Sequence, residues 1–166
     1  FATGFLVYGI ALIYGSAQTT SIEIITAGFA EYSSDIIFLV GILLFLIGFS
    51  FKIAAFPFHM WVPDVYQGAP TTVTGLFSTI GKAAAFAAII ATLTSLFSGK
   101  TTSMFLPYLA VLSIFSMLFG SIVAIAQSNI KRMLAYSSIS HAGYILIGLA
   151  SGTSVGVAGV VFYLAV

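Results

Sequence analysis

Two lysines lie inside long apolar runs of this sequence. Lys52 lies inside the run at 36–61, and Lys82 lies within the next run. A charged side chain inside a bilayer is costly, so intramembrane lysines are functional candidates by default. Burial disfavours the charged form of lysine and a nearby carboxylate favours it, so movement of a counter-charge can make such a lysine release or bind a proton. The two lysines therefore predict a proton-translocating membrane subunit.

Pro57 follows Lys52 by five residues and predicts a break in the same helix. Proline removes a backbone donor and its ring clashes with the preceding turn, so a helix kinks or unwinds there. Backbone groups freed in this way are tolerated in a membrane only where protein or water satisfies them. A hydrated lysine beside a helix break is the geometry expected of an ion pathway. We therefore predict a discontinuous transmembrane helix.

Helix geometry predicts that both lysines lie deep in the membrane. If its helix continues to Trp61, Lys52 lies roughly 13 Å from that end at 1.5 Å per residue. Lys82 lies roughly 18 Å from Pro70 by the same rule. A lysine near a helix end can extend its side chain to the membrane interface. This is a poor explanation for two lysines at similar depth on two different helices.

A structural role is the alternative for both lysines, since each can pair with an acid elsewhere in the whole protein. The sequence contains few acids, and all of them fall in predicted connections: Glu23, Glu31, Asp35 and Asp64. An intramembrane carboxylate partner is therefore expected outside this stretch of sequence.

Two histidines are weaker candidates for proton transfer. His59 follows the predicted break, and His141 lies among serines in a later apolar run. Both can titrate near neutral pH, which would make His59 an entry-side residue and His141 a secondary relay with water held by the serines. The alternative is that each only packs and forms a hydrogen bond. They are far apart in sequence and lack a neighbouring carboxylate, so no metal site is predicted.

The composition restricts the class of protein. Hydrophobic residues make up 60% and charged residues 5% of the sequence, against about 25% charged in an ordinary soluble domain. We therefore expect an integral membrane protein with the lipid bilayer as a partner. The net charge of +1 argues against nucleic acid as a partner. The sequence contains no cysteine, which excludes thiolate iron–sulfur ligation within it, so no redox chemistry is expected in this chain.

The apolar runs predict an all-α polytopic membrane protein. They lack the strict two-residue alternation of a β-barrel, and a spanning helix needs about 20 residues. The predicted spans are approximately 1–15, 36–61, 71–98, 104–128, 133–150 and 154–166, and residues 1–166 are expected to be part of one membrane domain. Because the sequence starts with Phe1 rather than Met and both ends lie in apolar runs, we expect a fragment whose terminal helices are cut.

The basic residues predict an orientation. Lys131 and Arg132 lie in the connection at 129–132, on the same predicted side as 62–70, whereas Lys100 is alone on the side of three acids. Cytoplasmic loops contain an excess of lysine and arginine. The side of Lys131 is therefore expected to be cytoplasmic.

Two runs of the sequence resemble a known family. Residues 51–71 read FKIAAFPFHMWVPDVYQGAPT, and residues 129–144 read NIKRMLAYSSISHAGY. Both are similar to the antiporter-like membrane subunits of respiratory complex I. Within this family, PDVYQGAPT and the lysine at position 82 resemble subunit N (subunit 2) of the NADH–quinone oxidoreductase. Sibling subunits and multi-subunit sodium/proton antiporters usually read PDAMEGPT there and often have histidine at the second lysine position.

The resemblance implies a fold and a set of site residues. It implies an antiporter-like helical bundle of about fourteen helices with inverted repeats, of the kind known in transporters. Lys52 matches the lysine on the broken helix of the first repeat, and Lys82 matches the connecting lysine on the following helix. The family pairs the first lysine with a glutamate on an earlier helix, and neither that helix nor the broken helix of the second repeat is present here.

The resemblance also implies a function. The chain is expected to be a subunit of a NADH:quinone oxidoreductase that couples quinone reduction to proton transfer in a bacterial inner membrane, next to the other membrane subunits of complex I. NADH, FMN, iron–sulfur clusters and quinone are expected in partner subunits, and no cofactor in this chain. A cation/proton antiporter subunit, or a structural membrane-arm subunit without its own proton path, are the alternatives.

Overall fold

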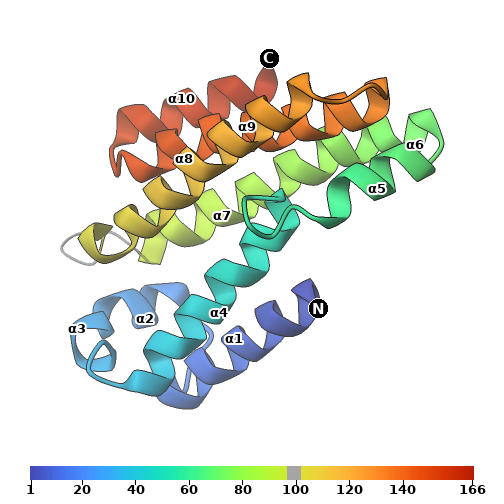
Figure 1. Cartoon of the computed structure of the whole chain (residues 1–166). Helices are drawn as coiled ribbons and strands as arrows, with labels where there is room; N and C mark the ends of the chain where they lie inside the picture. The colour runs from blue at the N-terminus through green and yellow to red at the C-terminus, as the bar shows by residue number, and fades with distance from the viewer. Residues whose placement is uncertain (97–101) are drawn as a thin grey trace.

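The fold is a bundle of α-helices (Figure 1). The computed structural model describes residues 1–96 and 102–166, and the side chains of 1–93 and 105–166. The predicted end of a span at 98, most of the connection at 99–103 and Lys100 therefore lie outside the described residues. The helices are α1 (Ala2–Ala17), α2 (Ile22–Ala27), α3 (Phe29–Tyr32), α4 (Ile36–Ile53), α5 (Trp61–Gly68), α6 (Thr71–Leu76), the π-helical turn η1 (Phe77–Gly81), α7 (Lys82–Leu96), α8 (Thr102–Ile125), α9 (Ile130–Ala150) and α10 (Ser154–Ala165).

Glycines let α1 and α4 pack closely. A Cβ atom on Gly9 would lie 2.6 Å from the backbone nitrogen of Phe45, and one on Gly48 would lie 2.8 Å from Cβ of Leu6. Small residues at a membrane helix interface allow such close approach of backbones. In Figure 1 the two helices run side by side as the blue and cyan part of the molecule.

Glycine and serine pack α8 against α9 in the same way. A Cβ atom on Gly120 would lie 2.7 Å from the backbone nitrogen of Ser140. Ser113 donates to the carbonyl of Gly143 at 2.7 Å, and the hydroxyls of Ser121 and Ser140 lie 2.9 Å apart. Hydrogen bonds between helices in a membrane each contribute about 0.6 kcal/mol on average. This pair therefore forms a firm support for the side chains of α9.

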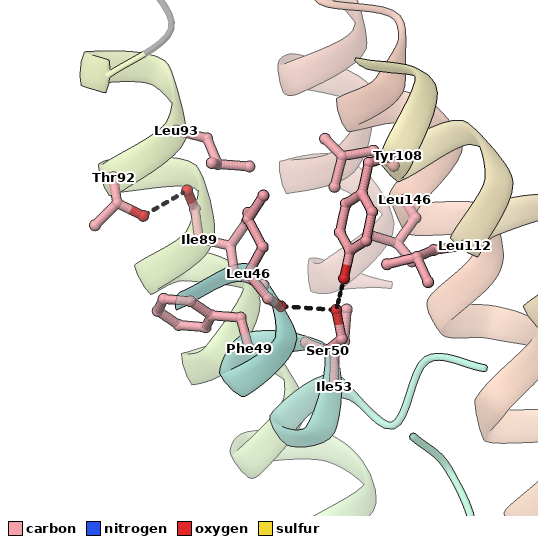
Figure 2. A pocket seen from close by; sticks show the side chains of 11 residues that line it. Leu46, Phe49, Ser50, Ile53, Ile89, Thr92, Leu93, Tyr108, Leu112 and Leu146 are labelled. Carbon is pink, nitrogen blue, oxygen red and sulfur yellow. Dashed lines mark hydrogen bonds between the residues drawn. The ribbon is translucent and has the colours of Figure 1, made fainter. Parts of the chain in front are cut away.

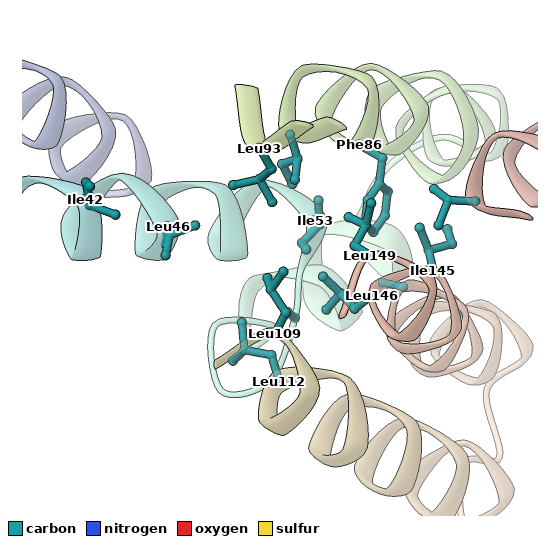
Figure 3. Close-up of a cluster of buried hydrophobic side chains, with 14 of the residues drawn as sticks. Ile42, Leu46, Ile53, Phe86, Leu93, Leu109, Leu112, Ile145, Leu146 and Leu149 are labelled. Carbon is teal, nitrogen blue, oxygen red and sulfur yellow. The ribbon is translucent and has the colours of Figure 1, made fainter. Parts of the chain in front are cut away.

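An apolar core joins the two pairs through α7 (Figure 3). Leu46 and Ile53 of α4, Phe86 of α7, Leu112 of α8 and Leu146 of α9 are all nearly inaccessible to solvent. Because apolar contacts are individually weak and collectively large, this cluster fixes α7 between α4 and α9. Lys82, the first residue of α7, is positioned by this packing.

Among the residues that the structure describes, four helical segments are long and apolar enough to cross a membrane. They are Ile36–Ile53, Thr71–Leu93, Phe105–Ile125 and Ile130–Ala150. The all-α fold is confirmed, and so is the predicted interruption of the span 36–61, because α4 ends at Ile53 and α5 begins only at Trp61.

The predicted polar connection at 16–35 contains two short helices, α2 and α3. Their apolar residues Ile25 and Phe29 are buried in the core. The sequence did not predict these helices, because the segment is too short and too polar to be recognised as a membrane span. Three of the acids therefore lie on short helices rather than in loops: Glu23 on α2, Glu31 on α3 and Asp64 on α5. Asp35 is the N-cap of α4, where its carboxylate accepts a hydrogen bond from the backbone nitrogen of Ile37 at 2.9 Å.

Candidate proton-transfer site

The break after α4 begins before Pro57. Helix α4 ends at Ile53, and Ala54 has a left-handed backbone with φ of 60°. In a continuous helix, residues 56 and 57 would donate to the carbonyls of Lys52 and Ile53. Here the backbone nitrogen of Phe56 donates instead to the hydroxyl of Ser116 on α8, at 2.9 Å, and Pro57 has no N–H. The two carbonyls thus lose their helical donors immediately beside Lys52.

Tertiary hydrogen bonds hold the broken segment in place. The indole nitrogen of Trp61 donates to the carbonyl of Phe51 at 3.1 Å, bridging the two sides of the break. Ser116 is fully buried, so its bond to Phe56 lies inside the protein. This agrees with the rule that non-helical backbone at membrane depth is buried in protein or lines a hydrated cavity. Sequence reasoning missed Ser116, because nothing in its local sequence marks it as a partner of residue 56.

Lys52 lies at the end of α4 rather than in the middle of a longer helix. It is the residue before Ile53, and its side chain is exposed on the surface of this chain. The predicted depth of roughly 13 Å assumed helical geometry up to Trp61, whereas the segment between α4 and α5 is not helical, so this depth stays a prediction. Within the described part of the chain, no hydrogen bond or ion pair to Lys52 is formed. The prediction of a buried side chain therefore does not hold within this chain.

Lys82 is buried and bound to a single residue of α9. Its side chain is 8% exposed. The amine Nζ donates to the backbone carbonyl of Ser138 at 2.6 Å and lies 3.0 Å from the Ser138 hydroxyl. That hydroxyl donates in turn to the carbonyl of Ala135 at 2.8 Å. Both acceptors of Lys82 are therefore neutral oxygens, and no carboxylate among the described residues pairs with it.

This pair of acceptors suits an amine that changes its protonation state. A neutral amine has two N–H groups, which the two Ser138 oxygens satisfy, and it keeps a lone pair free for a proton. A protonated amine has three N–H groups. Burial without a counter-charge favours the neutral form. The two acceptors of Lys82 therefore match the neutral amine, and the protonated amine has one N–H group more than they satisfy.

A π-helical turn comes immediately before Lys82. Ser78 and Thr79 both donate their hydroxyls to the carbonyl of Gly75, at 2.9 and 2.8 Å. Side chains that bond back to the helix backbone often bend a helix, and π-helical turns occur frequently at functional sites. The sequence analysis predicted an uninterrupted helix here, since no proline marks the irregularity.

The turn after the break packs against α9. Val62 and Tyr66 of α5 form a small apolar cluster with Ala135 and Ile139 of α9. The structure thereby places the two sequence runs that define the family resemblance against each other.

Polar contacts close the edge of this cluster. Arg132 forms an ion pair with Asp64 at 2.5 Å and bonds Gln67 at 3.1 Å. The amine of Lys131 donates to the carbonyl of Ala69 at 2.9 Å. Because Asp64 is mostly exposed, an ion pair of this type contributes little to stability. Its geometry instead fixes the orientation of α5 on α9.

His59 is buried between aromatic rings. Its ring centroid lies 5.4 Å from that of Phe56 and 4.6 Å from that of Phe119. Its Nδ1 atom is inaccessible and has no hydrogen-bond partner among the described residues. A buried nitrogen of this type costs free energy unless water or another group satisfies it. The geometry leaves the predicted entry-side role of His59 open.

His141 lies one helical turn after Ser138 but faces α10. Its Nδ1 atom lies 2.6 Å from the hydroxyl of Tyr163, and its side chain is exposed. The structure therefore does not place it in contact with Lys82. Sequence reasoning missed Tyr163, which belongs to a separate apolar run.

A small cavity lies between α4, α7, α8 and α9 (Figure 2). Its described lining is apolar apart from the hydroxyls of Ser50, Thr92 and Tyr108. The hydroxyls of Ser50 and Tyr108 lie 3.1 Å apart, and Ser50 also donates to the carbonyl of Leu46 at 2.8 Å. Neither Lys52 nor Lys82 is among the residues that line this cavity. In the part of the chain that is described, no group of three His, Cys, Asp or Glu side chains could hold a metal ion.

These features define a polytopic helical membrane protein with an interrupted helix. Its buried lysine, Lys82, is bound to neutral oxygens and has no carboxylate partner among the described residues. The model of the NADH:quinone oxidoreductase/Mrp antiporter transmembrane family matches residues 1–166. The chain belongs to this family.

Individual relatives agree with this assignment. The chain is 52% identical, over its whole length, to NADH-quinone oxidoreductase subunit N of Salinibacter ruber. It covers 33% of that protein, so it spans about a third of the length of the curated relatives it matches.

Solved structures show the same fold. The chain matches the Mrp complex of a Dietzia species with a TM-score of 0.87 and 31% identity, over 98% of this chain and 30% of that one. It matches respiratory complex I from Thermus thermophilus with a TM-score of 0.73 and 36% identity, over 98% of this chain and 34% of that one. The predicted antiporter-like helical fold is confirmed by both structures.

Proposed function

We propose that this chain is part of a proton-translocating membrane subunit of a NADH–quinone oxidoreductase, and that Lys52 and Lys82 transfer the protons. The observation that supports this most is Lys82, a buried amine bound only to neutral oxygens within the described residues. A permanently charged structural lysine would normally be paired with an acid, since unpaired burial of charge is costly. The identity to subunit N of relatives supports the choice of complex.

Lys82 acts as the site that accepts and releases the proton. When the proton arrives, the amine holds a third N–H group in a region of low dielectric. When the proton leaves, both remaining N–H groups stay bound to Ser138, so the geometry of α7 against α9 need not change. A site that keeps its hydrogen bonds in both states needs little reorganisation between them.

Lys52 is the proton donor to Lys82 in this proposal. Its side chain emerges from the surface of this chain at the helix break, beside the carbonyls of residues 52 and 53. We infer that a carboxylate elsewhere in the whole protein pairs with it. Quinone reduction in the complex moves this acid away, the charged form of Lys52 loses its stabilisation, and the proton passes through water to Lys82.

The remaining assignments follow from the same proposal. Pro57 keeps the helix open beside Lys52, and His59 and His141 are secondary candidates for proton entry and relay. The chain forms part of one membrane domain in a bacterial inner membrane, beside other membrane subunits of the complex. NADH, FMN, iron–sulfur clusters and quinone are bound by partner subunits. This chain would hold none of them and performs no redox chemistry.

A cation/proton antiporter subunit is the second candidate function. The TM-score of 0.87 to the Mrp complex favours it. The PDVYQGAPT segment and Lys82 argue against it, since they resemble subunit N. Sodium-dependent transport by the isolated full-length protein would support the antiporter, whereas pumping that requires quinone reduction and is independent of sodium would support the oxidoreductase.

Replacing Lys52 by Met in the full-length subunit tests the proposal. We expect the complex to assemble, because Lys52 makes no contact in the described residues that holds the helices together. Proton pumping driven by NADH oxidation should be lost. Pumping is measured in membrane vesicles with a pH-sensitive dye, and complex content by native gels. Normal pumping at normal complex content would falsify the role of Lys52. A structural role would instead reduce pumping only in proportion to the amount of complex.

A further inference from the structure

The hydroxyl of Tyr66 is a buried polar group to which the proposed function assigns no task. Tyr66 is 2% exposed, and its oxygen is inaccessible to solvent without a hydrogen-bond partner among the described residues. Burying a hydroxyl without a partner costs free energy, and phenylalanine would fill the same space without that cost. The hydroxyl therefore points to an additional interaction.

The position of Tyr66 directs this hydroxyl toward the binding site of Lys82. The tyrosine ring packs on Ala135 and Ile139, which flank Ser138 on one face of α9. Burial raises the pKa of Tyr66, and the side chain of Ser138 partly offsets this rise. The packing thus places Tyr66 against the face of α9 that contains Ser138, although its hydroxyl forms no hydrogen bond among the described residues. Ser138 is also the residue that binds Lys82.

The hydrogen bonds around Ser138 leave one acceptor missing. The Ser138 hydroxyl donates to the carbonyl of Ala135 and accepts from Lys82. Neutral Lys82 is fully satisfied by the two oxygens of Ser138. Protonated Lys82 has a third N–H group, for which the described residues supply no bonded acceptor. The Tyr66 oxygen is a buried acceptor without a partner at the same turn of α9.

We propose that Tyr66 is a positioning residue for Lys82, whose hydroxyl oxygen accepts the third N–H group of the protonated amine, directly or through one water molecule. This inference rests on the proposed function, because it assumes that Lys82 changes its protonation state. Tyr66 would thereby set the proton affinity of Lys82 from a segment that begins at the helix break.

Several other ionisable groups lie on the described elements around this contact, Tyr136 among them, which packs against the same cluster as Tyr66. Those on the surrounding described elements are Glu23 on α2, Lys52 on α4, Asp64 on α5, Tyr108 on α8, and Lys131, Arg132, Tyr136, His141 and Tyr144 on α9. Asp64 pairs with Arg132, and His141 bonds Tyr163. None of these side chains forms a hydrogen bond or ion pair with Lys82 in the described part of the chain.

Replacing Tyr66 by Phe in the full-length subunit of the assembled complex tests the inference. The ring packing is kept, so we expect normal complex content. Loss of one acceptor from a charged group should lower the pH at which Lys82 loses its proton by about one pH unit. The alkaline midpoint of proton pumping should shift down by the same amount. The measurement is pumping per electron transferred in vesicles between about pH 6 and 9, a range on either side of neutrality in which a buried lysine can titrate.

Tyr108→Phe is the matched control, since it also removes a tyrosine hydroxyl, but one of a half-buried residue that bonds Ser50. Its pumping profile should keep the wild-type midpoint. If Tyr66→Phe has normal complex content and an unchanged alkaline midpoint of pumping, the inference is overturned. Equal shifts of this midpoint in Tyr66→Phe and Tyr108→Phe would overturn it as well. Lys82→Met separates this result from the proposed function. If Lys82→Met still pumps, the proposed function fails; if it does not pump and Tyr66→Phe keeps its midpoint, only the role of Tyr66 fails.

Discussion

Replacing Lys82 by Met in the full-length subunit is expected to abolish coupled proton pumping while the complex still assembles. Methionine fills a similar volume, and its thioether cannot bind a proton. Burial of an amine costs desolvation free energy, and the substitution removes this cost with the amine. Replacing a buried ion by an apolar group often leaves the free energy of unfolding unchanged. The Ser138 hydroxyl keeps its bond to the carbonyl of Ala135. The loss is therefore expected in proton transfer rather than in stability.

The measurement for Lys82→Met compares proton pumping with electron transfer at equal complex content. We expect pumping to fall at least tenfold and electron transfer coupled to it to slow. A variant that pumps normally, or one whose pumping and electron transfer both decline only with the amount of complex, would contradict a role of Lys82 in proton transfer. Met is a sharper choice than Ala here, since it fills more of the space that the buried lysine side chain occupies.

Replacing Gly120 by Ala is expected to weaken the pairing of α8 with α9. The new Cβ atom would lie 2.7 Å from the backbone nitrogen of Ser140 and 2.9 Å from the carbonyl oxygen of Tyr136. Both are backbone atoms, so relief requires the helices to separate. Overpacking of this kind costs about 1–3 kcal/mol. The expected result is a lower thermal stability of the complex and a smaller assembled amount.

Gly159→Ala is the matched control for this prediction. No heavy atom outside its immediate helix surroundings lies within 4 Å of the Cβ position of residue 159, and alanine is favoured over glycine in a helix by up to about 1 kcal/mol. Stability should therefore be unchanged or slightly higher in this variant. Equal stability of the Gly120 and Gly159 variants would show that close packing of α8 on α9 is not required.

Much of the fold can be predicted from apolar length and composition alone. Runs of about 20 apolar residues determine helices in a membrane, because backbone groups there must bond within the helix. This reasoning gave α8 and α9 to within a few residues. It failed at residues 54–60, because the extent of unwinding around Pro57 depends on partners such as Ser116, which is sixty residues from Phe56 in sequence.

The candidate site was only partly predictable. Lys82 is recognisable because charge in an apolar run is rare. Its partner Ser138 is not, because a serine in a membrane helix usually bonds its own backbone, and this one does so as well. Tyr66 also escapes sequence reasoning, since an aromatic residue beside prolines suggests an interface anchor. Only packing of α5 on α9 shows that its hydroxyl is buried.

Lys52 shows the opposite limit. Its residue type and its position before Pro57 correctly place it beside a break, but depth and burial depend on surfaces that this chain alone does not cover. Because the chain spans about a third of its relatives' length, we expect the partner of Lys52 in the rest of the larger protein.

The number of protons pumped per electron in a complex carrying Lys82→Arg tests the central claim most directly. Arginine keeps the positive charge and can donate to Ser138, but it does not lose its proton in a protein. If Lys82 works by releasing and binding a proton, the Arg variant should assemble and yet pump as poorly as the Met variant. Pumping per electron at the wild-type level in Lys82→Arg would contradict the account, because a fixed charge would then suffice.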